Sequence, residues 1–125
     1  MNTTLNKIAS ILAFIIGGMA IFAGGKVLLG NDPGYYVINW LPVYNYTVGI
    51  LTVFITAILI WINSRLAKTV AIGTFSLHAF VMLILQTAYQ NVVAPDSIRA
   101  MTVRLIVWAI ILTLMFFQQR KNKTA

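Results

Sequence analysis

The sequence has no cysteine and very few groups that could exchange a proton. Without cysteine there are no thiol nucleophiles, disulfide bridges or thiolate metal ligands. Asp32 and Asp96 are the only acids, and His78 is the only histidine. Charged residues make up 9% of the 125 residues, whereas a soluble domain has roughly 25%. These shortages argue against a soluble globular domain, a disordered chain and a disulfide-rich scaffold.

Apolar residues are abundant instead, at 60% of the chain, and they form four long runs. A helix needs about 20 apolar residues to cross a bilayer core of roughly 30 Å. The sequence therefore predicts an all-α fold, an integral membrane four-helix bundle that forms a single transmembrane domain over residues 1–125. The first run is longer than a signal-peptide core, so we expect it to be retained. The predicted spans are 8–29, 46–62 (which could take in residues 43–46), 69–88 and 98–117, joined by outer loops at 30–45 and 89–97 and an inner turn at 63–68.

Basic residues are distributed unequally between the two sides of a four-span arrangement. Positive charge lies on one side at Lys7, in the 63–68 turn and in the 120–123 tail, whereas both acids fall on the other side. Short cytoplasmic segments carry an excess of Lys and Arg, so we expect both termini and the 63–68 turn to be cytoplasmic. The net charge of +7 then reflects topology and contact with anionic lipid head groups, and no nucleic-acid binding is expected.

Each predicted helix has one side that is poorly suited to lipid. In a bilayer, helices associate through small residues and occasional polar contacts. We therefore expect these sides to turn inward or toward a partner protein. They comprise Ser10, Ala13, Gly17, Ala20 and Gly24 in the first helix, Asn45, Gly49, Thr52, Thr56 and Asn63 in the second, Thr74, His78, Met82, Gln86 and Tyr89 in the third, and Ser97, Met101, Arg104 and Trp108 in the fourth.

The segment around 30–45 combines helix-breaking and aromatic residues. Pro33, Gly34 and Pro42 are expected to interrupt any long helix there. Tyrosine and tryptophan rings prefer the head-group level of a membrane. We therefore expect this loop to lie along the outer surface and to cover part of the bundle mouth. Its aromatic residues are Tyr35, Tyr36, Trp40, Tyr44 and Tyr46.

Two ionisable residues, His78 and Arg104, fall well inside the predicted spans. Their depths differ by about 6 Å at 1.5 Å per residue, and an arginine side chain spans that gap. An ionisable residue inside a membrane is a functional hypothesis by default. Arg104 would supply a fixed fork of donors, and His78 a hydrogen bond or a proton. We predict an outward-facing site for an anionic, quinone-like or lipid-like ligand, formed by Arg104, His78, Gln86, Lys26 and Trp108.

The same residues also fit a purely structural interpretation. Arg104 lies about two turns inside its helix, from where its side chain could extend to the interface. Intramembrane charges commonly pair with one another. In this interpretation the two acids neutralise Lys26 and Arg99, and no ligand is bound.

Known catalytic and metal-binding arrangements are not found in the sequence. A metal site usually needs three or four ligands, and His78 with Met101 falls short, so we predict no metal site and assign no cofactor. The spans contain no acid, and Ser76 and His78 lie on different helix faces, so we predict no catalytic residues and, on balance, no enzyme. We expect an accessory or subunit-type bundle in the lipid bilayer, either a homo-oligomer or part of a larger membrane complex.

The layout resembles the DoxX-like superfamily of small bacterial four-span membrane proteins. The resemblance rests on residues 18–26 (GMAIFAGGK), 32–35 (DPGY), 40–42 (WLP) and the short 63–68 turn, which together cover the first two thirds of the chain. It implies a bundle in the bacterial inner (plasma) membrane, an extracytoplasmic loop after the first helix, and association with membrane redox or stress systems. Many members carry an acid early in the second helix, where this chain has Val48, Gly49 and Ile50.

Two fragments are also similar to motifs of the dual-topology fluoride channels, namely residues 33–39 (PGYYVIN) and 73–76 (GTFS). This resemblance implies the alternative function, a small-anion channel or transporter that acts as a homodimer. Dual insertion needs a weak charge bias, whereas the basic residues here are one-sided. The early arginine of that family has at best Lys26 in its place.

Overall fold

The computed structural model describes residues 3–124, with side chains as far as Asn122. In chain order its elements are α1 (Thr4–Leu28), α2 (Leu41–Leu51), the π-helical turn η1 (Thr52–Thr56), α3 (Ala57–Trp61), α4 (Ala67–Thr87) and α5 (Pro95–Thr124). Because α2, η1 and α3 continue into one another, the described residues form four helical segments, each long and apolar enough to cross a membrane. The predicted all-helical fold with four candidate spans is confirmed.

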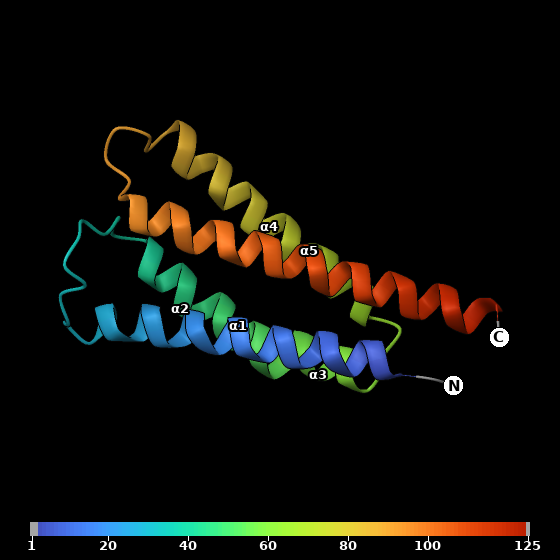
Figure 1. Ribbon diagram of the computed structural model, residues 1–125. Coiled ribbons are helices and arrows are strands. Elements are labelled where there is room, and N and C mark those ends of the chain that lie inside the picture. The colour runs from blue at the N-terminus through green and yellow to red at the C-terminus, as the bar shows by residue number, and fades with distance from the viewer. Residues whose placement is uncertain (1–2, 125) are drawn as a thin grey trace.

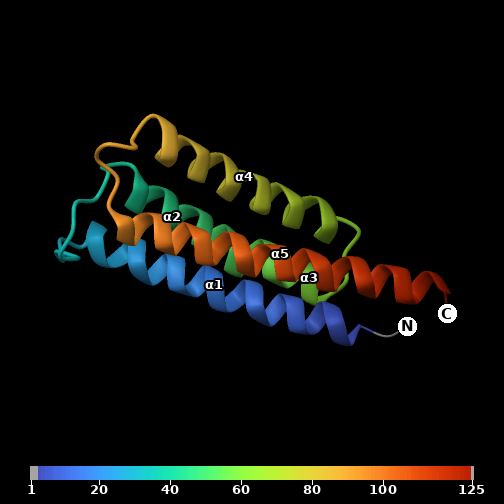
Figure 2. The ribbon, with the colours of Figure 1, turned by 45° about the horizontal axis from the view of Figure 1, so that its top comes forward.

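The bundle has two unlike ends, which are visible in Figures 1 and 2. The start of α1, the end of α5 and the 62–66 turn lie at one end, which we call the terminal end. The 29–40 and 88–94 connections lie at the other, which we call the loop end. Figure 2 shows α4 on the outside of the bundle, beside α5. Chain ends on the same side fit an even number of crossings.

Every helical segment begins before the apolar run that predicted it. The largest difference is in α2, which starts at Leu41 and not at residue 46, with Pro42 in its first turn. Proline suits that position because its missing N–H would be unpaired there anyway and its fixed φ is helical. Pro42 therefore begins a helix that it was expected to interrupt. As a result Tyr44, which was counted among the loop aromatics, and Asn45, which was placed at the border between that loop and the second predicted helix, both belong to a helix of the bundle.

The backbones of α1 and α2 approach each other closely at two glycines, one in each helix. A Cβ atom on Gly49 would lie 2.8 Å from the carbonyl oxygen of Gly17, and one on Gly24 would lie 2.6 Å from that of Pro42. No side chain larger than hydrogen fits at such distances. All five small residues predicted to face inward from α1 are buried, which confirms that stripe.

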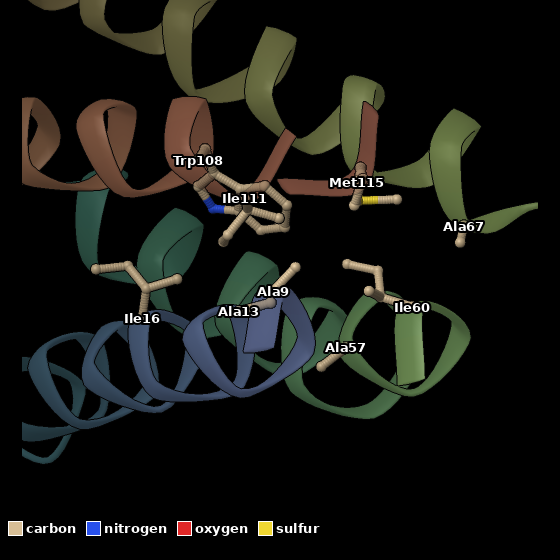
Figure 3. Close-up of a cluster of buried hydrophobic side chains, with 10 residues drawn as sticks. Ala9, Ala13, Ile16, Ala57, Ile60, Ala67, Trp108, Ile111 and Met115 are labelled. Atoms are coloured by element: carbon tan, nitrogen blue, oxygen red, sulfur yellow. The ribbon is translucent and has the colours of Figure 1, made fainter. Parts of the chain in front are cut away.

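A cluster of apolar side chains fills the middle of the bundle and its terminal half. Trp108 and Ile111 point from α5 toward α1, where Ala9 and Ala13 leave room for them, and Met115 extends the cluster toward Ile60 and Ala67 (Figure 3). The small residues on α1 thus match the large ones on α5, which allows dense packing. The other buried members of the cluster are Ile16, Ala57 and Ala71.

Candidate functional site

Arg104 lies inside the bundle with only 6% of its surface exposed. Its Nη1 donates a hydrogen bond to Asn45 Oδ1 at 2.5 Å and lies 3.4 Å from Met101 Sδ. Both partners are neutral. A buried charge without a partner of opposite sign is costly, because the lost hydration is not replaced by an ion pair. Because arginine stays protonated in proteins, the guanidinium is a buried positive charge with neutral partners.

Neither acid of the chain neutralises this charge. The carboxylate of Asp32 accepts a hydrogen bond from the backbone N–H of Gly34 at 2.9 Å, and Asp96 is exposed in the first turn of α5. Lys26 lies with its Nζ 5.3 Å from the centre of the Phe22 ring. The ion pairs that the structural interpretation requires, between the two acids and Lys26 or Arg99, are not formed among the residues that the structure describes.

His78 is held by a residue that neighbours Asn45 in α2. The hydroxyl of Tyr44 lies 2.5 Å from His78 Nδ1, and the two rings meet edge to face with centroids 5.7 Å apart. Tyr44 and Asn45 are consecutive, so one short stretch of α2 engages both buried ionisable residues, His78 and Arg104. On the loop-end side of this contact, Trp40 Nε1 donates to the hydroxyl of Tyr89 at 3.1 Å. Aromatic and amide groups of α2 thus connect it to both α4 and α5.

Trp108 completes the group from one turn further along α5. Its side chain is fully buried, and its ring centroid lies 6.4 Å from that of His78. Its indole Nε1 has no hydrogen-bond partner among the described residues. An unmade bond of a buried donor costs about 1–3 kcal/mol. The site therefore contains a buried charge and a buried donor that nothing within the described chain satisfies.

Two small cavities meet at Arg104. The deeper one has a volume of about 10 Å³ and is lined by Arg104, His78, Trp108 and Thr52 together with Gly17 and Gly49. The other lies toward the loop end, has a volume of about 50 Å³, and is lined by Arg104, Asn45, Tyr35, Ser97 and Pro42 among others. A volume of about 10–15 Å³ is needed for a single water molecule. The two cavities suit one or a few atoms and are too small for a quinone ring.

The structure brings together three of the five predicted site residues, namely Arg104, His78 and Trp108. Lys26 and Gln86 are exposed and do not join them. The buried stripe of α4 runs through Ala71, His78, Val81 and Leu85, and Gln86 lies off this stripe because it follows Leu85 directly. Sequence reasoning missed Tyr44 and placed Asn45 only on a helix face. Recognising Pro42 as a helix start would have placed both residues beside the site.

Comparison of the chain with known protein families, characterised proteins and solved structures found no match. The resemblances to the DoxX-like superfamily and to the fluoride channels therefore stay predictions.

Proposed function

We propose that this protein is a multi-pass membrane protein that binds a small anion at Arg104. The observation that carries the proposal is a buried guanidinium that has neutral partners only and lines two small cavities. The buried Trp108 N–H adds an unused donor beside the charge. Donors without acceptors suit an anion, because an anion accepts hydrogen bonds and balances the charge at once.

The anion would enter from the loop end of the bundle. The larger of the two cavities lies on that side, and Arg104 forms part of the wall of both. By the charge distribution described above, we place the termini in the cytoplasm and the loop end outside. The protein would then take up its ligand from the extracytoplasmic side of a bacterial inner membrane, alone, as a homo-oligomer or within a larger complex.

A small-anion channel is the second candidate, and the size of the deeper cavity favours it. A cavity of about 10 Å³ has room for a single-atom anion but not for an anion of several atoms. Beyond Trp108, however, the apolar cluster with Ile111 and Met115 fills the path toward the terminal end. Within one chain this arrangement supports binding more than passage. Anion efflux from liposomes that contain the purified protein would favour the channel, and protein-dependent binding without efflux would favour the binding function.

Trp108 offers a direct test of the binding proposal. In the variant Trp40→Phe/Trp61→Phe it is the only tryptophan left, so its fluorescence reports on the deeper cavity. The purified variant is titrated with fluoride, chloride, nitrate and formate, and gluconate keeps the ionic strength constant because it is too large for either cavity. We expect at least one of the four anions to change the emission saturably and to raise the midpoint of thermal unfolding, since a ligand that binds only the folded state stabilises it.

Two further variants decide whether Arg104 is responsible. Arg104→Lys keeps the charge but loses the planar fork of donors, and it should abolish the saturable response. Arg99→Gln removes an exposed cation from the same helix and should leave the response intact. Circular dichroism shows whether each variant is folded. The proposal is wrong if none of the four anions gives a saturable response, or if folded Arg104→Lys responds like its parent.

A further inference from the structure

A much larger cavity lies at the terminal end of the bundle, opposite the Arg104 site. Its volume is about 520 Å³, which is within the roughly 300–1,000 Å³ of typical small-molecule sites. It is bounded by the first turns of α1 and α4 and by the last turns of α5. Its polar lining includes Asn6, Asn63, Arg65, Lys68 and Gln118.

The charged groups of this lining are all positive. Arg65 and Lys68 lie on either side of the start of α4 and are both exposed, and no acid lines the cavity. Leu66, the N-cap of α4, makes no side-chain cap, although Ser64 Oγ accepts a hydrogen bond from its backbone N–H at 3.2 Å. A helix start favours a negative group. Two cations beside such a helix start suit a phosphate, which accepts charge-assisted hydrogen bonds from both.

The cavity also contains an acceptor that is not used within the described chain. Asn6 is only 5% exposed, and its Nδ2 donates to Asn63 Oδ1 at 2.7 Å. Its own Oδ1 is buried without a hydrogen-bond partner among the described residues. A hydroxyl group in the cavity would supply the missing donor once the Asn6 amide turned toward it. An ammonium group would suit the site less well, because no carboxylate lines the cavity to balance it.

One wall of the cavity is apolar and continues onto the outer surface of the bundle. Leu112, Met115 and Phe116 form this wall on α5. Phe116 is exposed on its outer side, and the Nζ of Lys68 lies 4.9 Å from the centre of its ring. A ligand whose polar part occupies the cavity could therefore lay an apolar part along α5. The lining matches a molecule with a phosphate, hydroxyl groups and hydrocarbon chains.

We propose that this cavity binds one anionic glycerophospholipid with a hydroxyl-bearing head group, of the phosphatidylglycerol type. Its phosphate lies between Arg65 and Lys68, a head-group hydroxyl reaches Asn6, and its acyl chains follow α5. The inference uses the membrane location of the proposed function but is independent of the anion site at Arg104. If the lipid proposal fails, the anion proposal still stands, and the reverse also holds.

Native mass spectrometry of the purified full-length protein in detergent tests the proposal. The protein is titrated with phosphatidylglycerol, phosphatidylethanolamine and phosphatidylcholine that carry the same acyl chains. We expect one phosphatidylglycerol to remain bound at concentrations at which the other two are lost. Soluble glycerol phosphate, added as a competitor, separates the lipid from a free phosphate ester, and should displace phosphatidylglycerol only weakly.

Matched double variants assign the binding to this cavity. Arg65→Gln/Lys68→Gln should weaken phosphatidylglycerol binding about tenfold or more, given the usual contribution of a basic residue near an anionic lipid. Lys7→Gln/Lys26→Gln removes the same charge outside the cavity and should have little effect. All four side chains are exposed, so the packing is undisturbed, and thermal unfolding checks this. Equal losses in both variants, no preference among the three lipids, or strong displacement by glycerol phosphate would overturn the proposal.

Discussion

Asn45 Oδ1 and Arg104 Nη1 lie 2.5 Å apart and join α2 to α5 inside the bundle. This contact satisfies a donor of the guanidinium but leaves its charge uncompensated, because an amide oxygen carries only a partial negative charge. A carboxylate at the same position would have closed the site by forming an ion pair. The neutral partner orients the arginine without neutralising it. This is the arrangement that the proposed anion site requires, and it differs from a structural salt bridge.

The close contact between α1 and α2 predicts that alanine substitutions at two glycines of α1 differ sharply in their effect on stability. Gly24→Ala should destabilise the protein by about 1–3 kcal/mol, as overpacking does, because the new Cβ would lie 2.6 Å from the carbonyl oxygen of Pro42. Gly18→Ala is the matched control in the same helix. A Cβ there meets nothing within 4 Å, so it should be neutral or slightly stabilising. Unfolding in mixed detergent micelles measures both, and equal effects would contradict the close approach.

The hydrogen bond between Tyr44 and His78 predicts an energetic coupling. In a double-mutant cycle, Tyr44→Phe and His78→Phe should be non-additive by about 0.5–1.5 kcal/mol, the usual net value of a buried hydrogen bond. Tyr46→Phe with His78→Phe is the control pair. Tyr46 is exposed and has no bond to His78, so these two changes should add. Additive effects in the first cycle would show that Tyr44 and His78 do not interact.

The one-sided basic residues predict a single orientation in the membrane. Reporter fusions at Lys123 and within the 30–40 connection should give opposite results, with a cytoplasmic signal at Lys123 and an extracytoplasmic signal in the connection. Alkaline phosphatase is active only outside the cytoplasm and green fluorescent protein folds best inside it, so the pair reads both sides. Both reporters active at both positions would instead indicate dual insertion and favour the homodimeric channel.

The sequence predicted the site and packing residues whose types are unusual within an apolar span. Arg104 and His78 stand out because ionisable groups are rare inside spans, and Gly17 and Gly24 stand out because small residues mark close helix contacts. Tyr44 was missed, and Asn45 was placed only on a helix face, because Pro42 has opposite meanings at the start and in the middle of a helix. Gln86 was misplaced because a step of one residue turns a side chain by about 100°. A step of one residue therefore decides whether a side chain faces the interior of the bundle or its outer surface.

The same angular step gives the π-helical turn η1 a particular importance. A π-helical turn contains one more residue than an α-helical turn, so it sets the rotational phase of α2 relative to α3. Deleting one residue of Thr52–Thr56 would restore a regular α-helix and rotate α2 by about 100° against α3. Asn45 and Tyr44 would then turn away from Arg104 and His78, while α3 kept its own contacts. The arrangement of side chains around Arg104 thus depends on a single inserted residue about two turns away from Asn45 along the chain.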